Sequence, residues 1–150
     1  PELGEMVPLL AQQLEAAGFK VTQDVREYNQ IESEALAGKF HAVLVSRSTV
    51  LDSGDAVAYM TADFSSSGSY SMSGLHDEKV DAAISKAAAT QPGDERHKAI
   101  MAAEQAILAS GAAIPLAHER VIQGEAAGVT GAQRDPGERA LITSATTVKK

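Results

Sequence analysis

The spacing of apolar residues changes near Gly18, and this change most constrains what the chain can fold into. Up to Ala17 the apolar residues recur at helical intervals, and Gly18 stands where helices commonly end in the left-handed conformation. Across residues 19–26 apolar and polar residues alternate, as in a half-buried strand. The pattern predicts a helix that ends at Ala17, and that begins near Pro8 because proline suits a first turn, followed by a strand.

A second helix and a second strand follow at short intervals. Residues 29–36 have helical spacing and are closed by Gly38. Residues 42–45 form a continuous apolar run rich in β-branched side chains, typical of a strand covered on both faces. Strands joined by a helical crossover run parallel. We therefore expect a β-α-β unit and an α/β fold, with a small, mainly parallel sheet flanked by helices.

The middle of the chain has three further helical patterns and one more strand pattern. Helices are predicted at residues 57–64, after a capping Asp77, and at residues 94–109. A third strand, at an edge or irregular because of Pro115, is predicted at residues 112–117. The residues expected to be buried in the two later helices are Val80, Ala83, Ile84, Ala87, Ile100, Ala103, Ile107 and Leu108.

Length and composition limit the class of protein. The 150 residues fit one domain, with the role of the tail from about residue 119 left open. Alanine occurs 27 times and aromatic residues make up 4%, so the core has to rely on small residues in close helix contacts. A net charge of −7 argues against a nucleic-acid partner. No apolar run approaches the length that spans a bilayer.

The loop after the second predicted strand is the first candidate site. Ligands gather beyond the carboxyl ends of parallel strands, and residues 46–55 there offer hydroxyls and the carboxylates of Asp52 and Asp55. A partly desolvated Asp would recognise an ammonium group, in a hydrogen bond that contributes about 1.5–3 kcal/mol. The alternative is that Asp52 and Asp55 only cap the next helix, which spacing alone favours.

A serine-rich stretch and four histidines give weaker signals. Residues 65–74 contain six Ser and two Gly, and either cover a ligand, with Tyr70 as the main contact, or form a solvated connector. His41, His76, His97 and His118 fall in no metal-ligand spacing, so no metal site and no cofactor are predicted. The sequence contains no nucleophile elbow and no phosphate-binding or dinucleotide motif, so we do not predict an enzyme.

The order of short motifs resembles the carboxyl-terminal lobe of family 5 solute-binding proteins, the extracytoplasmic receptors of peptide and nickel ABC importers. The match covers roughly residues 6–118. The motifs are QLEAAGF at 13–19 after Pro8, GKFHA at 38–42, LDSGD at 51–55, the stretch 74–81, DER at 94–96, AEQAIL at 103–108 and AIPL at 113–116.

The resemblance implies one lobe of a two-lobed, periplasmic-binding-protein-like receptor that closes on its ligand. Its partners would be the second lobe of the same protein and an ABC permease. In peptide-binding members an Asp at the position of Asp52 pairs with the ligand's amino terminus, and the backbone of Ser48, Thr49 and Val50 pairs with the peptide as an added strand. The implied ligand is an oligopeptide or dipeptide, and the implied location is periplasmic or a cell-surface lipoprotein.

The sequence departs from the family's pattern at three positions. Thr49 replaces an aromatic residue, Ala56 replaces a proline, and His41 replaces an aspartate. A nickel chelate or another small cationic solute therefore stays open as the ligand. The alternatives from other classes are a stand-alone protein-interaction domain whose helices at 77–109 form the partner surface, and a hydrolase that uses His76 or His118.

Overall fold

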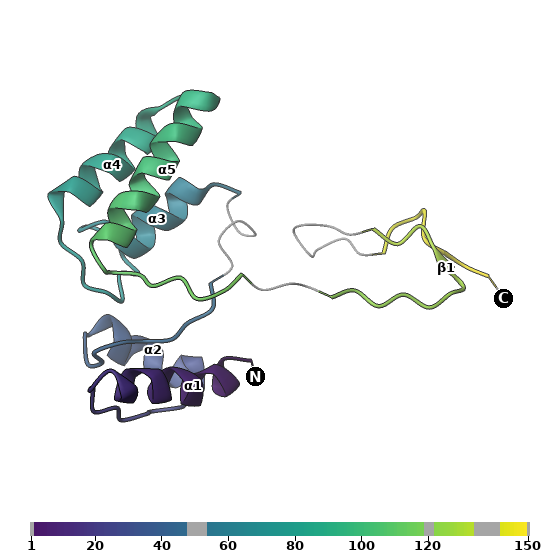
Figure 1. Cartoon of the computed structure of the whole chain (residues 1–150). Coiled ribbons are helices and arrows are strands. Elements are labelled where there is room, and N and C mark those ends of the chain that lie inside the picture. Colours follow the sequence, from purple (N-terminus) through teal and green to yellow (C-terminus); the bar gives the residue numbers. More distant parts are fainter. Residues whose placement is uncertain (1, 48–53, 119–121, 134–141, 150) are drawn as a thin grey trace.

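The computed structural model describes residues 2–47, 54–118, 122–133 and 142–149. Within these ranges the chain forms five helices and one two-stranded antiparallel sheet (Figure 1). In chain order they are α1 (Glu2–Ala16), α2 (Tyr28–Leu36), α3 (Ala56–Phe64), α4 (Glu78–Ala89), α5 (Asp94–Ala109), β1 (Val129–Thr130) and β2 (Thr147–Val148).

The prediction of an α/β fold with a mainly parallel sheet is wrong. The predicted strands lie at residues 19–26, 42–45 and 112–117, and none of these residues is in a helix or a strand. Within the described part of the chain, the backbone of residues 20–26 and 42–47 forms no hydrogen bond with another segment. A strand is stable only in a ladder with a neighbour, so alternation by itself did not make these segments strands.

All five helices lie where the helical patterns are, although the start of α1 differs. It begins at Glu2 and contains Pro8, whereas the sequence predicted a start near Pro8. Pro8 leaves the carbonyl of Gly4 without its helical partner, and Gly4 is exposed, so water can hydrate that carbonyl. The helix ends at Ala16, where Gly18 (φ 96°) allows the amide of Phe19 to donate to the carbonyl of Leu14.

The main core lies between α3, α4 and α5, which pack on one another (Figure 1). Of the expected core, Ile84, Ala87 and Ile107 are buried, but Leu108 is 40% exposed and does not belong to it. The buried cluster comprises Val57, Val80, Ile84, Ala87, Ala99, Ala103 and Ile107, with Ala83, Ile100 and five other partly buried residues against it. Three of its seven members are alanines, as the composition predicted.

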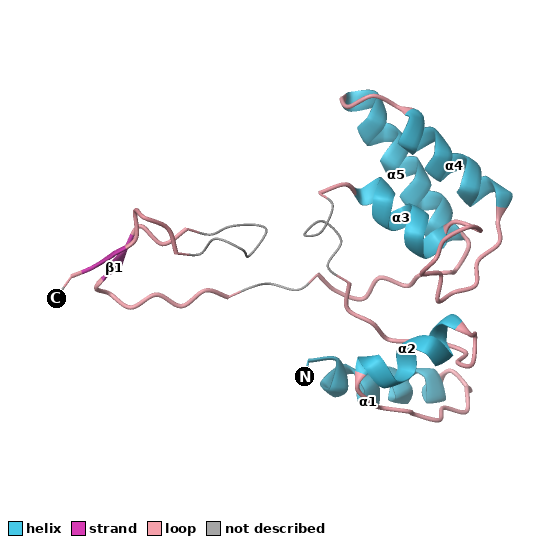
Figure 2. Cartoon of the chain, turned by 180° about the vertical axis from the view of Figure 1, so that it is seen from behind, coloured by secondary structure: helices cyan, strands magenta, loops and turns pink. Residues whose placement is uncertain are grey.

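The helices α1 and α2 lie apart from α3–α5 (Figures 1 and 2). Each contributes one buried alanine, Ala11 and Ala35. Arg26 ties the segment before α2 to that helix, because its guanidinium donates to the carboxylates of both Asp24 and Glu34. We call residues 2–47 the N-terminal unit and residues 54–118 the three-helix unit.

The end of the chain forms a small hairpin. β1 and β2 are antiparallel, with Val129 opposite Val148 and Thr130 opposite Thr147, whose hydroxyls lie 2.8 Å apart. The described part of this segment is set apart from the helices in Figure 1. None of the described helices combines the length and apolar character needed to cross a membrane.

Candidate binding site

The predicted binding loop is described only at its two ends. Ser48, Thr49, Val50 and Asp52 lie outside the described residues. Asp55 and Tyr70 are described, and the described part of the candidate site consists of these two residues and the side chains around them.

Asp55 caps α3, as the alternative interpretation predicted. Its carboxylate accepts a hydrogen bond of 2.9 Å from the amide of Val57, and its backbone is extended. The other carboxylate oxygen accepts a 2.7 Å hydrogen bond from the guanidinium of Arg96 on α5. Asp55 therefore ties the end of the loop to two helices, while its direct contact with a ligand stays a prediction.

Arg96 links this cap to the end of α4. Its guanidinium donates to the backbone carbonyls of Ala87 (2.7 Å) and Thr90 (2.9 Å), so a side chain satisfies acceptors that a helix end leaves open. The Arg96 side chain is 18% exposed and that of Asp55 44% exposed. This role of Arg96 was not predicted, because its partners are remote in the sequence and no local pattern indicates them.

An open surface cavity of about 690 Å³ lies beside this ion pair. It extends from Gly54, at the end of the predicted binding loop, to the turn between α4 and α5. Its lining consists of Gly54, Asp55, Ala56, Ala88, Thr90, Gln91, Pro92, Arg96, His97 and Ile100. Because Asp55 and Arg96 bond each other, the two charges facing this cavity largely neutralise one another.

The start of the loop is held by Arg47. Its guanidinium forms two hydrogen bonds with Asp63 of α3, at 2.9 and 3.1 Å, and Asp63 is only 8% exposed. The same group lies over the rings of Tyr59 (4.9 Å) and Tyr70 (4.5 Å). The roles of Arg47 and Asp63 were not predicted. Tyr70 was expected either to contact a ligand or to belong to a solvated connector, and in the structure its ring lies against Arg47.

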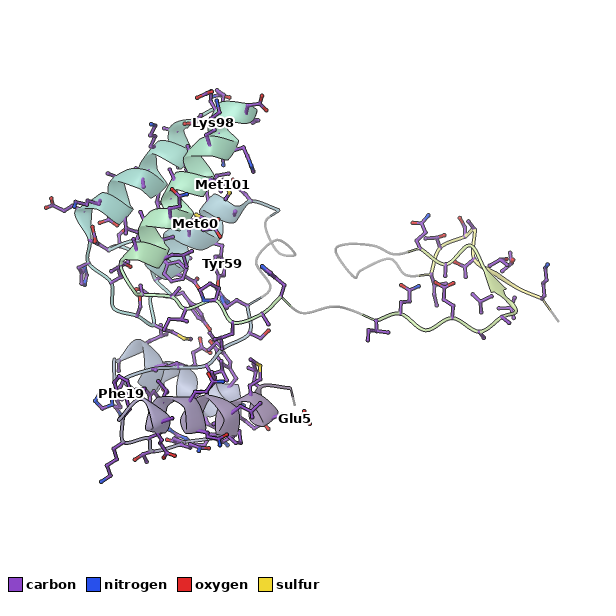
Figure 3. All side chains as sticks on the ribbon, in the orientation of Figure 1. Glu5, Phe19, Tyr59, Met60, Lys98 and Met101 are labelled. Carbon is purple, nitrogen blue, oxygen red and sulfur yellow. The ribbon has the colours of Figure 1, made fainter. Side chains whose placement is uncertain are left out.

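Burial and charge shift the pKa values in this cluster. Burial alone would lower the pKa of Arg47, but the hydrogen bonds and charge of Asp63 raise it overall. The pKa of Tyr59 is raised, first by burial and then by the negative charge of Asp63. The Tyr59 side chain, labelled in Figure 3, lies on the side of α3 that faces this cluster. Arg47 stays charged and Tyr59 stays neutral at neutral pH.

The serine-rich stretch folds onto α3 and α4. The buried Ser65 donates its hydroxyl to the carbonyl of Thr61, and the amide of Tyr70 donates to the carbonyl of Ala62. The turn passes so close to α3 that a side chain at Gly68 would overlap the carbonyls of Thr61 and Ala62. Ser66, Ser67, Ser69 and Ser73 are exposed, as expected of a surface loop.

Asp81, a residue of α4, also bonds the serine-rich stretch of residues 65–74. Its carboxylate accepts a 2.8 Å hydrogen bond from the amide of Ser66. Hydrogen bonds from the side chain and the backbone of Ser66 lower the pKa of Asp81. The loop is thus anchored by two helices and is more ordered than its composition indicated.

The described residues contain no cluster of three or more His, Asp or Glu side chains able to hold a metal ion. Comparison with known proteins finds no family model, no curated protein and no solved structure that matches the chain.

Proposed function

We propose that this chain belongs to the substrate-binding component of an ABC importer and binds peptides or small cationic solutes through the loop of residues 46–55. The proposal starts from the motifs that occur in the order of family 5 solute-binding proteins across residues 6–118. The structural observation that carries it is the fixation of both ends of this loop to the helix α3.

The two fixed ends are Arg47 and Asp55. Arg47 is held by two hydrogen bonds to Asp63 of α3, and Asp55 caps the first turn of the same helix and bonds Arg96. A loop held at both ends loses less conformational entropy when a ligand orders it. This arrangement favours a binding loop over a plain connector.

The proposed ligand anchor within the loop is the carboxylate of Asp52. A ligand ammonium group that bonds it would gain about 1.5–3 kcal/mol, and the net charge of −7 adds long-range attraction for cations. Backbone pairing along Ser48, Thr49 and Val50 would add peptide-specific hydrogen bonds. The proposed role is binding, with no chemical change to the ligand.

The proposed partners are a second lobe of the same receptor and an ABC permease. Closure of two lobes would bury the ligand, and release to the permease would follow reopening. This role places the protein outside the cytoplasm, in the periplasm or on the cell surface.

Calorimetry on the complete receptor, expressed from the whole reading frame that encodes this sequence, tests the proposal. Short peptides with free amino termini should bind at least about tenfold more weakly to Asp52→Asn, since a lost charge-assisted bond is worth that factor or more. Acetylated peptides should bind both proteins equally. Glu104→Gln, a matched loss of one exposed carboxylate on α5, should leave affinity unchanged.

One result would contradict this proposal, and a second would decide which of the proposed ligands binds. Equal affinity of Asp52→Asn and the unsubstituted protein for free peptides removes Asp52 as the anchor. Binding of a nickel chelate or another cationic solute in place of any peptide identifies the receptor class but changes the ligand.

A second candidate function is a protein-interaction surface on α5. Met101 and Leu108 are 42% and 40% exposed, and their spacing of seven residues places them on the same side of the helix. Met101 lies on the outer side of the bundle in Figure 3. If this surface is the functional one, Met101→Lys with Leu108→Lys abolishes partner capture from a lysate while Asp52→Asn does not.

A further inference from the structure

The connection between the N-terminal unit and the three-helix unit depends on few side chains. Residues 41–47, which lead from α2 toward α3, contain no helix or strand and make no backbone hydrogen bond within the described part of the chain. Hydrogen bonds and ring contacts between described residues of the two units all come from Arg47. Among the described residues, the hydrogen bonds and ring contacts between the two units are therefore concentrated in a single guanidinium.

We propose that Arg47 acts as a latch that holds the N-terminal unit against the three-helix unit. The geometry suits this role because one carboxylate and two aromatic rings contact the flat guanidinium of Arg47. Asp63 and Tyr59 come from α3, and Tyr70 comes from the serine-rich stretch that is itself bonded to α3 and α4. When the guanidinium leaves this position, the segment of residues 41–47 can turn and the two units can move independently.

The chemistry of arginine is essential to the latch. A guanidinium can bond both oxygens of the Asp63 carboxylate and stack between two rings at once, which an ammonium group cannot do. Asp63 is 8% exposed, so its carboxylate gains little from water if Arg47 leaves. The burial of Asp63 therefore favours the state in which Arg47 is hydrogen-bonded to it.

Arg26 provides a matched control within one unit. Its guanidinium also bonds two oxygens of one carboxylate, that of Asp24, and lies 5.9 Å from the centre of the Phe40 ring. All of these partners belong to the N-terminal unit. Loss of Arg26 therefore removes similar contacts without touching the connection between the units.

Distances between spin labels test the latch, and the natural sequence contains no Cys that would compete for the label. One label pair, at Ser33→Cys on α2 and Ala102→Cys on α5, measures the distance between the units. A second pair, at Lys86→Cys and Ala102→Cys, reports on the three-helix unit alone. All three positions are exposed.

Arg47→Met should widen the distance distribution between the units about twofold, because no other described side chain bonds across them. The distribution within the three-helix unit should stay narrow. Arg47→Lys should give an intermediate width, and Arg26→Met should leave both distributions unchanged. In Arg47→Met with Asp63→Asn, which removes the buried carboxylate charge, the wider distribution between the units should persist.

The latch is overturned if the distribution between the units keeps its width in both Arg47→Met and the double variant. It is also overturned if the label pair within the three-helix unit widens equally in both, because Arg47 then maintains the fold of that unit and does not couple two units.

Discussion

Single charged residues determine where several helices begin and end. Asp55 and Asp77 each precede a helix in extended conformation and accept hydrogen bonds from its first amides. Arg96 acts at the carboxyl-terminal end of a helix. Its guanidinium donates a hydrogen bond to a carbonyl at the end of α4 and another to the carboxylate of Asp55. The two aspartate caps are local, so the spacing of Asp before an apolar run predicted them correctly, whereas the contacts of Arg96 join residues that are remote in the sequence.

The cap of α4 should be measurable in isolation. Asp77 accepts bonds from the amides of Lys79 (2.8 Å) and Val80 (3.4 Å). We expect Asp77→Ala to lower the free energy of unfolding by about 1 kcal/mol, as is usual for a lost N-cap. Asp77→Asn keeps a capping oxygen and should lose much less. Urea denaturation followed by circular dichroism measures both, and equal losses would contradict the capping role.

The contact of Asp81 with Ser66 should depend on pH. The pKa of Asp81 is lowered in the folded protein by hydrogen bonds from Ser66, so its carboxylate form stabilises the fold above the ordinary pKa of 3.8. This stabilisation is lost as the pH falls through the lowered pKa, below 3.8. The chemical shift of the Ser66 amide should therefore titrate with a midpoint below 3.8. A midpoint above that value, or the same titration in Asp81→Asn, would refute the assignment.

At the scale of elements, the packing of α4 against α5 depends on alanine. Ala87 on α4 and Ala103 on α5 are completely buried, and both helices present small side chains to their common interface. Small residues let helix backbones approach closely, and this compensates for the scarcity of large aromatic side chains in the sequence. The interface therefore has little space for larger residues.

A larger side chain at Ala103 should be costly. We expect Ala103→Leu to destabilise the protein by about 1–3 kcal/mol, because a filled interface has to move to admit the added atoms. Ala102→Leu adds the same atoms at the neighbouring exposed position of α5 and should be nearly neutral. Thermal unfolding compares the two variants. Similar midpoints for both would show that the interface is not close-packed.

At the scale of the whole molecule, the contacts between described helices and strands fall into two separate groups. One joins α3, α4 and α5, and the other joins β1 and β2 in the hairpin, whose described residues are 122–133 and 142–149 (Figures 1 and 2). The hydrogen bonds of the described hairpin residues are internal, such as the 2.9 Å bond from the amide of Lys149 to the carbonyl of Gly128. The apolar core of the helices receives no described contribution from the hairpin.

This separation predicts that the hairpin is dispensable for the helices. A chain that ends at His118 should show the same midpoint of thermal unfolding, followed by helical circular dichroism, as the full chain. A chain that ends at Gly93 lacks α5, and with it Ala103 and Ile107 of the core, so it should lose its cooperative transition. A lower midpoint after removal of residues 119–150 would show that the tail stabilises the helices.

Part of the candidate site was also predictable. The capping role of Asp55 follows from its position one residue before an apolar helical pattern. Its ion pair with Arg96 did not follow, because 41 residues separate the two in sequence and only the packing of α3 with α5 brings them together. The same holds for Arg47 and Asp63, since a sequence shows no distance between remote charges.

The sequence by itself determined the helices, because helical hydrogen bonds form between residues four apart and a period of 3.6, a capping aspartate and a closing glycine are all local signals. It did not determine the strands, because a strand needs backbone hydrogen bonds with a remote segment, and the backbone of residues 20–26 and 42–47 forms none within the described structure. Only the tertiary structure decided which charges pair, because pairs such as Arg47 with Asp63 form when packing brings distant residues within hydrogen-bonding distance.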